Sequence, residues 1–153
     1  MPDIVNISTL EEEPSGVLLQ RSLTLPNSIE TIPLLNEFID GVVEELGLDM
    51  SLGMSLNLAL EEAVVNVMDY AYPAGVQGEV GIKLWATDAL LKFSITDSGI
   101  PFDPTKTKDA DTTLSAEERP IGGLGIFLVK QLMDKVSYER ANGKNVLTLQ
   151  KNI

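Results

Sequence analysis

Residues 121–129 read Ile-Gly-Gly-Leu-Gly-Ile-Phe-Leu-Val, and the rest of the chain is interpreted from this stretch outward. Three glycines fall within four positions, and an apolar run with helical spacing follows them through residue 133. Glycine lets the backbone approach a ligand closely, and the free N–H groups of a first helical turn favour an anion. The stretch therefore predicts either an anion site at a helix start or an ordinary glycine turn.

A second pattern lies upstream, in a long helical stretch at about residues 51–71. The stretch is apolar on most of its circumference, so we expect this helix to be largely buried. Glu62 and Asn66 are four residues apart and therefore lie on one face, whereas Glu61 falls elsewhere on the helical wheel. A carboxylate and an amide on a buried helix need partners or a function. The alternatives are a solvated stripe or hydrogen bonds satisfied within the core.

The third pattern is Asp97-Ser98-Gly99-Ile100-Pro101, which directly follows a stretch of alternating apolar residues. A carboxylate at a strand end, followed by glycine and proline, predicts a rigid turn that presents the Asp97 side chain. The same residues also occur in ordinary β-turns. The polar stretch that follows, to residue 120, is long for a loop inside a compact domain and is typical of a lid, a binding loop or disorder.

The remaining pattern predicts an α+β two-layer sandwich with a mostly antiparallel sheet and the helices on one face. Alternation predicts strands at 17–25, 79–87, 90–96, 135–140 and 145–150, and helical spacing predicts helices at about 28–46, 51–71 and from the glycines to about 134. The chain of 153 residues is expected to form a single domain, 1–153. Residues 1–15 are predicted to be a loose N-terminal segment or to hold a short strand at 4–7.

Composition narrows the classes of function. The chain has 11 Lys and Arg against 23 Asp and Glu, a net charge of −12, so nucleic acid and anionic membranes are poor partners. Cysteine and histidine are absent, which excludes disulfides, a Ser-His-Asp triad, histidine zinc sites and a phospho-accepting histidine in this chain. The sequence shows no membrane-spanning run and no secretory signal, so we expect a cytoplasmic protein.

In chain order, the three patterns are Glu62-x-x-x-Asn66, Asp97-x-Gly99-x-Pro101 and Gly122-Gly123-Leu124-Gly125. Together they resemble the ATP-binding domain of the GHKL superfamily, which includes histidine kinases, gyrase, the ninety-kilodalton heat-shock chaperones and mismatch-repair ATPases. The residues of these motifs and their neighbours look like those of the bacterial anti-sigma-factor serine kinases, and the resemblance covers about residues 20–150. The resemblance implies a Bergerat-type ATP-binding fold with ATP and Mg²⁺ as ligands.

The resemblance also implies roles for single residues. Asn66 would hold Mg²⁺ through its amide oxygen, a hard ligand for a hard cation. Asp97 would accept a hydrogen bond from the adenine amino group, and Gly99 would let the base approach, with Pro101 in the same nucleotide-binding turn. Glu62 would be the general base that activates a serine hydroxyl or a water.

The glycine motif and the polar loop complete the implied site. Gly122, Gly123, Leu124 and Gly125, with the helix that follows, would hold the phosphates. Residues 103–121 would form the ATP lid, and Arg119 in this lid is a candidate for contact with the γ-phosphate. The chain departs from many relatives at Tyr70, where they carry a histidine four residues beyond the asparagine. Tyr70 puts the efficiency of phosphate transfer and the choice of partner in question.

Three functions are compatible with this interpretation. The first is an ATP-dependent serine/threonine protein kinase that binds a sigma factor and phosphorylates a small anti-anti-sigma partner. The second is a nucleotide-gated protein-binding module with little or no kinase activity. The third is a detached histidine-kinase catalytic domain that acts in trans, because the chain has no histidine of its own. A homodimer is also compatible with the sequence, since an exposed N-terminal strand would offer a sheet edge.

Overall fold

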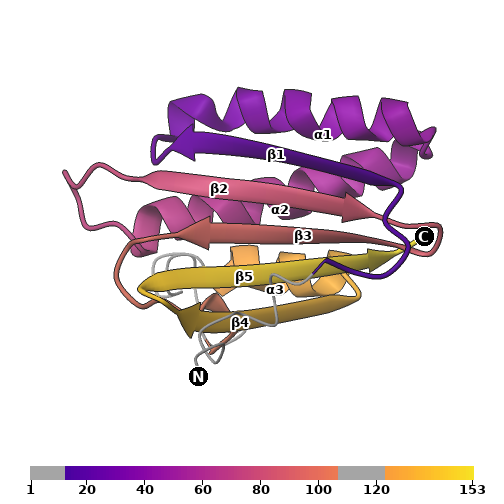
Figure 1. Ribbon diagram of the computed structural model, residues 1–153. Coiled ribbons are helices and arrows are strands. Elements are labelled where there is room, and N and C mark those ends of the chain that lie inside the picture. Colours follow the sequence, from indigo (N-terminus) through magenta and orange to yellow (C-terminus); the bar gives the residue numbers. More distant parts are fainter. Residues whose placement is uncertain (1–12, 107–122) are drawn as a thin grey trace, which may run out of the picture.

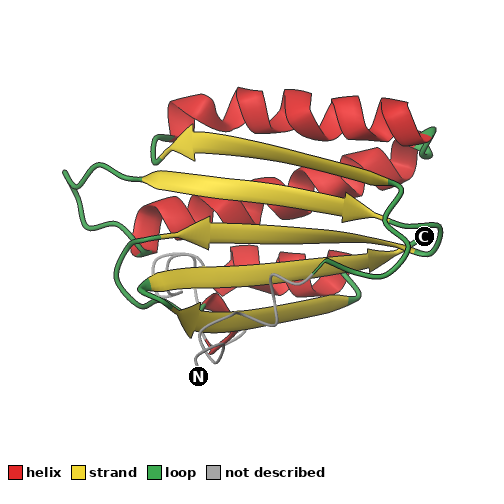
Figure 2. Ribbon diagram, viewed as in Figure 1, coloured by secondary structure: helices red, strands yellow, loops and turns green. Residues whose placement is uncertain are grey.

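The computed structural model describes residues 13–106 and 123–153, and these residues form two layers. One layer is a five-stranded sheet, and the other contains the α-helices, which all cover the same face of the sheet (Figures 1 and 2). This arrangement confirms the predicted α+β sandwich. The short strand predicted as an alternative at residues 4–7 lies outside the described residues.

The strands pair in the order β1-β2-β3-β5-β4, and each neighbouring pair is antiparallel. Their bounds are Leu19–Pro26 for β1, Glu79–Ala86 for β2, Leu90–Asp97 for β3, Lys135–Ala141 for β4 and Lys144–Asn152 for β5. The order follows from two hairpins, because β2–β3 and β4–β5 are each joined by a short turn. The second hairpin then pairs with the first through β3 and β5, which leaves β1 and β4 at the edges.

The helical layer contains α1 (Ile32–Leu46), α2 (Met50–Tyr70) and α3 (Gly123–Leu132). A short 3₁₀ helix, η3 (Ile29–Thr31), precedes α1, and the Ser28 side chain caps it by accepting from the Glu30 backbone N–H. Gly47 ends α1 in the left-handed conformation, at φ 64°, which glycine adopts without strain. The helix predicted at about 28–46 is thus a 3₁₀ turn that begins after Ser28, followed by α1, which ends at Leu46.

The core lies between the two layers and follows the period-2 pattern of the strands. Alternate side chains of β2 and β3 point toward the helices and are 0–1% exposed: Val80, Ile82, Leu84, Leu91, Phe93 and Ile95. Helices α1, α2 and α3 supply the opposing apolar side chains of the same cluster. Burial on this scale provides the main stabilising free energy of the domain.

Burial differs from the simple pattern at two places, and the expected burial of the helix at 51–71 is wrong in part. The first half of α2 is not largely buried, because Met50, Met54 and Leu58 are 79%, 69% and 42% exposed. The outer surface of a helix in a two-layer fold has no further layer to cover it. Conversely, Trp85 is only 3% exposed although it alternates with the core-facing residues of β2. The Nζ atoms of Lys83 and Lys92 lie 5.5 and 5.6 Å from its ring centroid, so these two side chains cover it.

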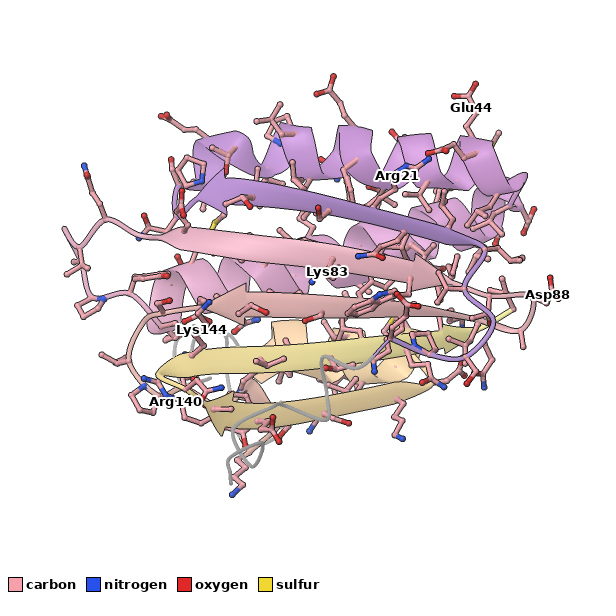
Figure 3. The ribbon with its side chains drawn as sticks, in the orientation of Figure 1. Arg21, Glu44, Lys83, Asp88, Arg140 and Lys144 are labelled. Atoms are coloured by element: carbon pink, nitrogen blue, oxygen red, sulfur yellow. The ribbon has the colours of Figure 1, made fainter. Side chains whose placement is uncertain are left out.

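One end of the sandwich gathers segments that are distant in sequence. The end of β3, the start of β5, the end of β4 and the C-terminal end of α2 lie together at the left in Figure 1. Figure 3 shows Arg140 of β4 and Lys144 of β5 at this same end. The antiparallel order explains the gathering, because it returns β5 to the residue at which β3 ends.

Candidate functional site

Asp97 is the last residue of β3, and its side chain is 3% exposed. Its Oδ1 accepts hydrogen bonds of 2.8 Å from the Gly99 backbone N–H and from Asn145 Nδ2. Its Oδ2 is buried and has no hydrogen-bond partner among residues 13–106 and 123–153. A buried acceptor without a donor is costly and rare, so this oxygen is the atom of the turn that a ligand N–H group would satisfy.

The protonation of Asp97 is set by opposing influences. Burial raises the pKa of the carboxyl above its ordinary value of 3.8, because the charged form is poorly solvated. The hydrogen bonds from Asn145 and Gly99 act in the opposite direction, as does the positive charge of Arg140. These donors favour the ionised form, which can accept a hydrogen bond at each oxygen, but burial outweighs them and the pKa is raised.

Asn145 is the second residue of β5 and lies opposite Asp97 in the strand pairing. Besides Asp97, its amide nitrogen donates to the Ile100 carbonyl oxygen at 2.8 Å. Its amide oxygen accepts from the Phe102 backbone N–H at 3.2 Å and from the Tyr138 hydroxyl. One side chain thereby ties the end of β3, the turn that follows it and strand β4 together.

Gly99 is required by packing against the end of α2. A Cβ at this position would lie 2.1 Å from the carbonyl oxygen of Ala71, the residue that follows α2. The same carbonyl accepts a hydrogen bond of 2.8 Å from the Ile100 backbone N–H. Arg140 Nη1 donates to the Gly99 carbonyl oxygen, also at 2.8 Å. Because Gly99 has no side chain, the Asp97 turn can pack directly against the end of α2.

Glu62 and Asn66 lie on α2, one turn apart, and the structure confirms that they share a face of the helix. Asn66 is 5% exposed, and its Nδ2 donates to the Glu62 carbonyl oxygen at 3.0 Å. This bond leaves the amide oxygen of Asn66 for another partner. The half-buried Glu62 carboxylate makes no hydrogen bond and no ion pair with any residue of the described ranges. The expected burial therefore holds for Asn66, and Glu62 is only partly enclosed.

Tyr70 is one turn beyond Asn66, and its ring stacks on Phe102 with centroids 5.2 Å apart and an interplanar angle of 27°. The Tyr70 hydroxyl is buried and has no hydrogen-bond partner in the part of the chain that the structure describes. Burial is the main cause that raises the pKa of Tyr70, and the negative charge of Asp69 adds to it. The hydroxyl therefore stays protonated at neutral pH. The stack closes the junction between α2 and the segment that leads into the polar loop.

The glycine motif is described only in part. Helix α3 begins at Gly123, so Gly123, Leu124 and Gly125 form its first turn, as the sequence predicts. Gly122 and Arg119 lie outside the described residues, as does the predicted lid beyond Lys106. The start of that segment, residues 104–106, forms a short 3₁₀ helix, η4 (Pro104–Lys106).

Asn145, Tyr138 and Arg140 were not among the predicted site residues. Asn145 carries a sequence signal in retrospect, because it takes a core-facing position in the alternation with Leu147 and Leu149. A polar residue at such a position needs a buried partner. The partner itself, Asp97, follows only from the pairing of β3 with β5.

Surface hollows of the described residues touch the Asp97 turn but not the Glu62 and Asn66 side chains. A hollow of 380 Å³ is lined by Asp97 and Ser98 together with residues of β1, β2 and β3. A hollow of 910 Å³ is formed by residues 26–28, 68–69 and 72–79, and it includes neither Glu62 nor Asn66 nor Asp97. Another, of 690 Å³, touches Gly99 and Arg140 from the side of the 72–79 loop. We therefore define the candidate site by the unsatisfied polar atoms along α2 and the Asp97 turn.

The fold and these motifs define a class of protein. Residues 25–151 match the family described as "Histidine kinase-like ATPase domain", and the chain belongs to this family. The match confirms the GHKL-type resemblance drawn from the three motifs. Within residues 13–106 and 123–153, the structure contains no helix long and apolar enough to cross a membrane.

The curated relatives are kinases. The chain is 28% identical over 125 residues to "Serine-protein kinase RsbW" of Halalkalibacterium halodurans. This match covers 79% of this chain and 76% of that protein. It is 31% identical over 98 residues to "Serine/threonine-protein kinase BtrW" of Bordetella bronchiseptica. This second match covers 64% of this chain and 69% of the relative. These relatives confirm the resemblance to serine kinases of this class.

A solved structure supports the fold. It is the crystal structure of the RsbU and RsbW domains of Rv1364c from Mycobacterium tuberculosis, with a TM-score of 0.62 at 17% identity. The match covers 87% of this chain and 32% of that longer protein. At this identity the likeness is one of fold.

Proposed function

We propose that the protein is an ATP-dependent serine/threonine protein kinase that acts as an anti-sigma regulatory factor. The observation that carries the proposal is the buried, unpartnered Oδ2 of Asp97, which offers an acceptor to the amino group of adenine. It is supported by the family, by the kinase relatives and by the position of Asn66 and Glu62 on the helix that abuts the Asp97 turn.

Asn66 is the proposed Mg²⁺ ligand. Its amide nitrogen is already engaged, so its oxygen is the atom available to a cation. The described residues contain no group of three acidic side chains that would hold a metal by themselves. Mg²⁺ keeps several waters and takes few protein ligands, so the triphosphate would supply most of its remaining oxygens. The first turn of α3, at Gly123, would offer backbone N–H groups to the phosphates.

Glu62 is the proposed general base. Its carboxylate would take the proton of the partner's serine hydroxyl while the serine oxygen bonds to the γ-phosphorus and the bond to the ADP oxygen breaks. The carboxylate has no competing donor in the described part of the chain, so it is available for this proton. Gly122, Leu124, Gly125, Gly99, Pro101 and Arg119 complete the proposed nucleotide contacts.

The proposed partners are a sigma factor and a small anti-anti-sigma substrate protein in the cytoplasm. A phosphate on the substrate would add negative charge to a surface that meets a kinase of net charge −12, which would weaken the complex. Edge strand β1 is the proposed surface for a homodimer, because it can pair with a second strand.

A nucleotide-gated binding module is the second candidate. It is favoured by the Glu62 carboxylate, which has no hydrogen-bond partner to orient it among the described residues, and by Tyr70 at the position of the common histidine. In such a module nucleotide would bind and organise a partner surface without phosphate transfer. The two candidates share the nucleotide site and differ only in the role of Glu62.

Calorimetric titration with ATP, with and without Mg²⁺, tests the nucleotide site on which both candidates depend. We expect saturable binding that strengthens with Mg²⁺. The Asn66→Ala variant should retain binding but lose the dependence on Mg²⁺, because the base contacts stay intact. Absence of ATP binding by the wild-type protein would contradict both candidates.

A further inference from the structure

The Asn145 amide has no hydrogen-bonding capacity left for a ligand. Its nitrogen donates to Asp97 Oδ1 and to the Ile100 carbonyl, each at 2.8 Å. Its oxygen accepts from the Phe102 backbone N–H and from the Tyr138 hydroxyl. A primary amide offers two donors and one acceptor oxygen with two lone pairs, so all four positions are used. Asn145 therefore acts on a ligand only through the groups that it holds.

Tyr138 helps to hold the orientation of this amide. The side chain lies on β4 and pairs with Leu147 of β5, so it approaches Asn145 from the side opposite Asp97. Burial is the main cause that raises the pKa of Tyr138, so its hydroxyl is protonated and donates at neutral pH. Its donation to the amide oxygen adds to that of the Phe102 N–H, and both favour the orientation with the oxygen toward Tyr138 and the nitrogen toward Asp97. Removing the hydroxyl leaves the Phe102 N–H, at 3.2 Å, as the one described donor to the amide oxygen, with the Ile100 carbonyl and Asp97 Oδ1 still accepting from the nitrogen.

We propose that Tyr138 and Asn145 are positioning residues that make the site selective for a purine with a 6-amino group. Together they keep the Asn145 nitrogen on Asp97 Oδ1, beside the Gly99 N–H. Oδ2 is then the oxygen of Asp97 without a donor in the described part of the chain, and it acts as an acceptor. The proposal rests on the proposed nucleotide site at Asp97 and adds how that site distinguishes bases.

The discrimination follows from the polarity of the base edge. A 6-amino group donates to an ionised Oδ2, whereas the 6-oxo group of a purine such as hypoxanthine presents a second acceptor to it. A flipped Asn145 amide would place its oxygen against Asp97 Oδ1. The carboxyl would then be driven to carry a proton or to rotate, and a protonated Oδ2 donates to a 6-oxo group. Loosening the Asn145 orientation therefore weakens ATP binding and relaxes the rejection of the 6-oxo base.

The test compares two Tyr→Phe variants that each remove one buried hydroxyl. Tyr138→Phe removes the bond to Asn145. Tyr72→Phe is the matched control, because the Tyr72 hydroxyl donates to the Glu79 carbonyl at 2.7 Å and accepts from the Ser98 N–H at 3.1 Å, on the same turn. It has no bond to Asn145 or Asp97. Dissociation constants are measured by calorimetry for ATP and for inosine triphosphate with Mg²⁺, and the unfolding temperature is recorded for each protein.

We expect the ratio of the inosine triphosphate constant to the ATP constant to fall by about three- to tenfold in Tyr138→Phe, the fold-change for one neutral hydrogen bond. In Tyr72→Phe the unfolding temperature should fall while the ratio stays that of the wild type. An unchanged ratio in Tyr138→Phe, or an equal fall in both variants, would overturn the proposal. Failure of the wild-type protein to bind either nucleotide would instead refute the proposed function, so the two failures are distinguishable.

Discussion

The two ends of the candidate site are built differently. At the Asp97 end, β3, β4, β5 and the end of α2 are tied by hydrogen bonds through Asn145, Arg140 and the Ala71 carbonyl. At the Glu62 end, Asn66 makes one hydrogen bond within its own helix, and the Glu62 carboxylate makes none within the described ranges. The first end has its geometry before a ligand arrives, whereas the second has polar atoms without fixed partners.

This difference assigns recognition and chemistry to separate parts of the fold. A recognition site discriminates best when its groups are held before binding, since ordering them on binding costs free energy. A general base must meet a hydroxyl that belongs to another protein, so its final geometry depends on that partner. The following changes test this division, from the largest expected effect to the smallest.

Glu62→Gln tests the chemical end. Phosphate transfer to the partner's serine should fall by about 10²–10⁴, the contribution of a general base, while the dissociation constant for ATP stays within about threefold. The rate is measured by single-turnover transfer of labelled phosphate. Glu61→Gln is the matched control, because Glu61 lies on the same helix but contacts Asn36 at 3.5 Å. Transfer at the normal rate in Glu62→Gln would refute the base assignment and favour a binding module or another base.

Asp97→Asn tests the recognition end. The substitution adds a donor where the base amino group also donates, so ATP binding should weaken by about thirty- to hundredfold in calorimetry. Asp103→Asn is the control, because within the described residues the Asp103 side chain accepts from Thr105 and caps the η4 turn. Equal losses in the two variants would show that the effect comes from net charge rather than from the Asp97 contact.

Gly99→Ala tests whether the recognition end depends on α2. The added Cβ would lie 2.1 Å from the Ala71 carbonyl oxygen, so the turn or the helix end must move, at a cost of about 1–3 kcal/mol in the free energy of unfolding. Gly41→Ala in α1 is the control, since no atom lies within 4 Å of its Cβ. Urea unfolding should show Gly41→Ala as stabilising, by about 0.5–1 kcal/mol. Stability unchanged in Gly99→Ala would contradict the described contact.

The pH dependence of ATP binding gives the smallest effect. The pKa of Asp97 in the folded protein is raised above 3.8, mainly by burial. As the pH falls through this raised pKa, the proton goes to the bare Oδ2 and ATP loses its acceptor, so its dissociation constant should rise. The folded state binds this proton more tightly than the unfolded state does. The contribution of Asp97 to the free energy of unfolding therefore becomes more favourable as the pH falls, whereas ATP binding becomes weaker. Calorimetry and urea unfolding across the same pH range measure both, and Asp97→Asn should abolish both dependences.

The sequence predicted most of the fold because its signals are local. The alternation of Val80, Ile82 and Leu84 defines a strand face, and Gly47 after an apolar helical stripe defines a helix end. The prediction failed where burial depends on neighbouring layers. Met54 is exposed because nothing covers the outside of α2, and Trp85 is covered by two lysines from adjacent strand positions.

For the site, the sequence alone determined the three motifs, their order and the family that the comparisons confirm. It placed Glu62 and Asn66 on one helix face, because helical periodicity is fixed by local geometry. Only the tertiary structure decided that Asn145 and Tyr138 would hold Asp97, and that Gly99 would pack on Ala71. These contacts join residues up to 48 positions apart. They follow from the pairing of β5 with β3 and β4 and from the packing of the Asp97 turn on the end of α2, which no local pattern specifies.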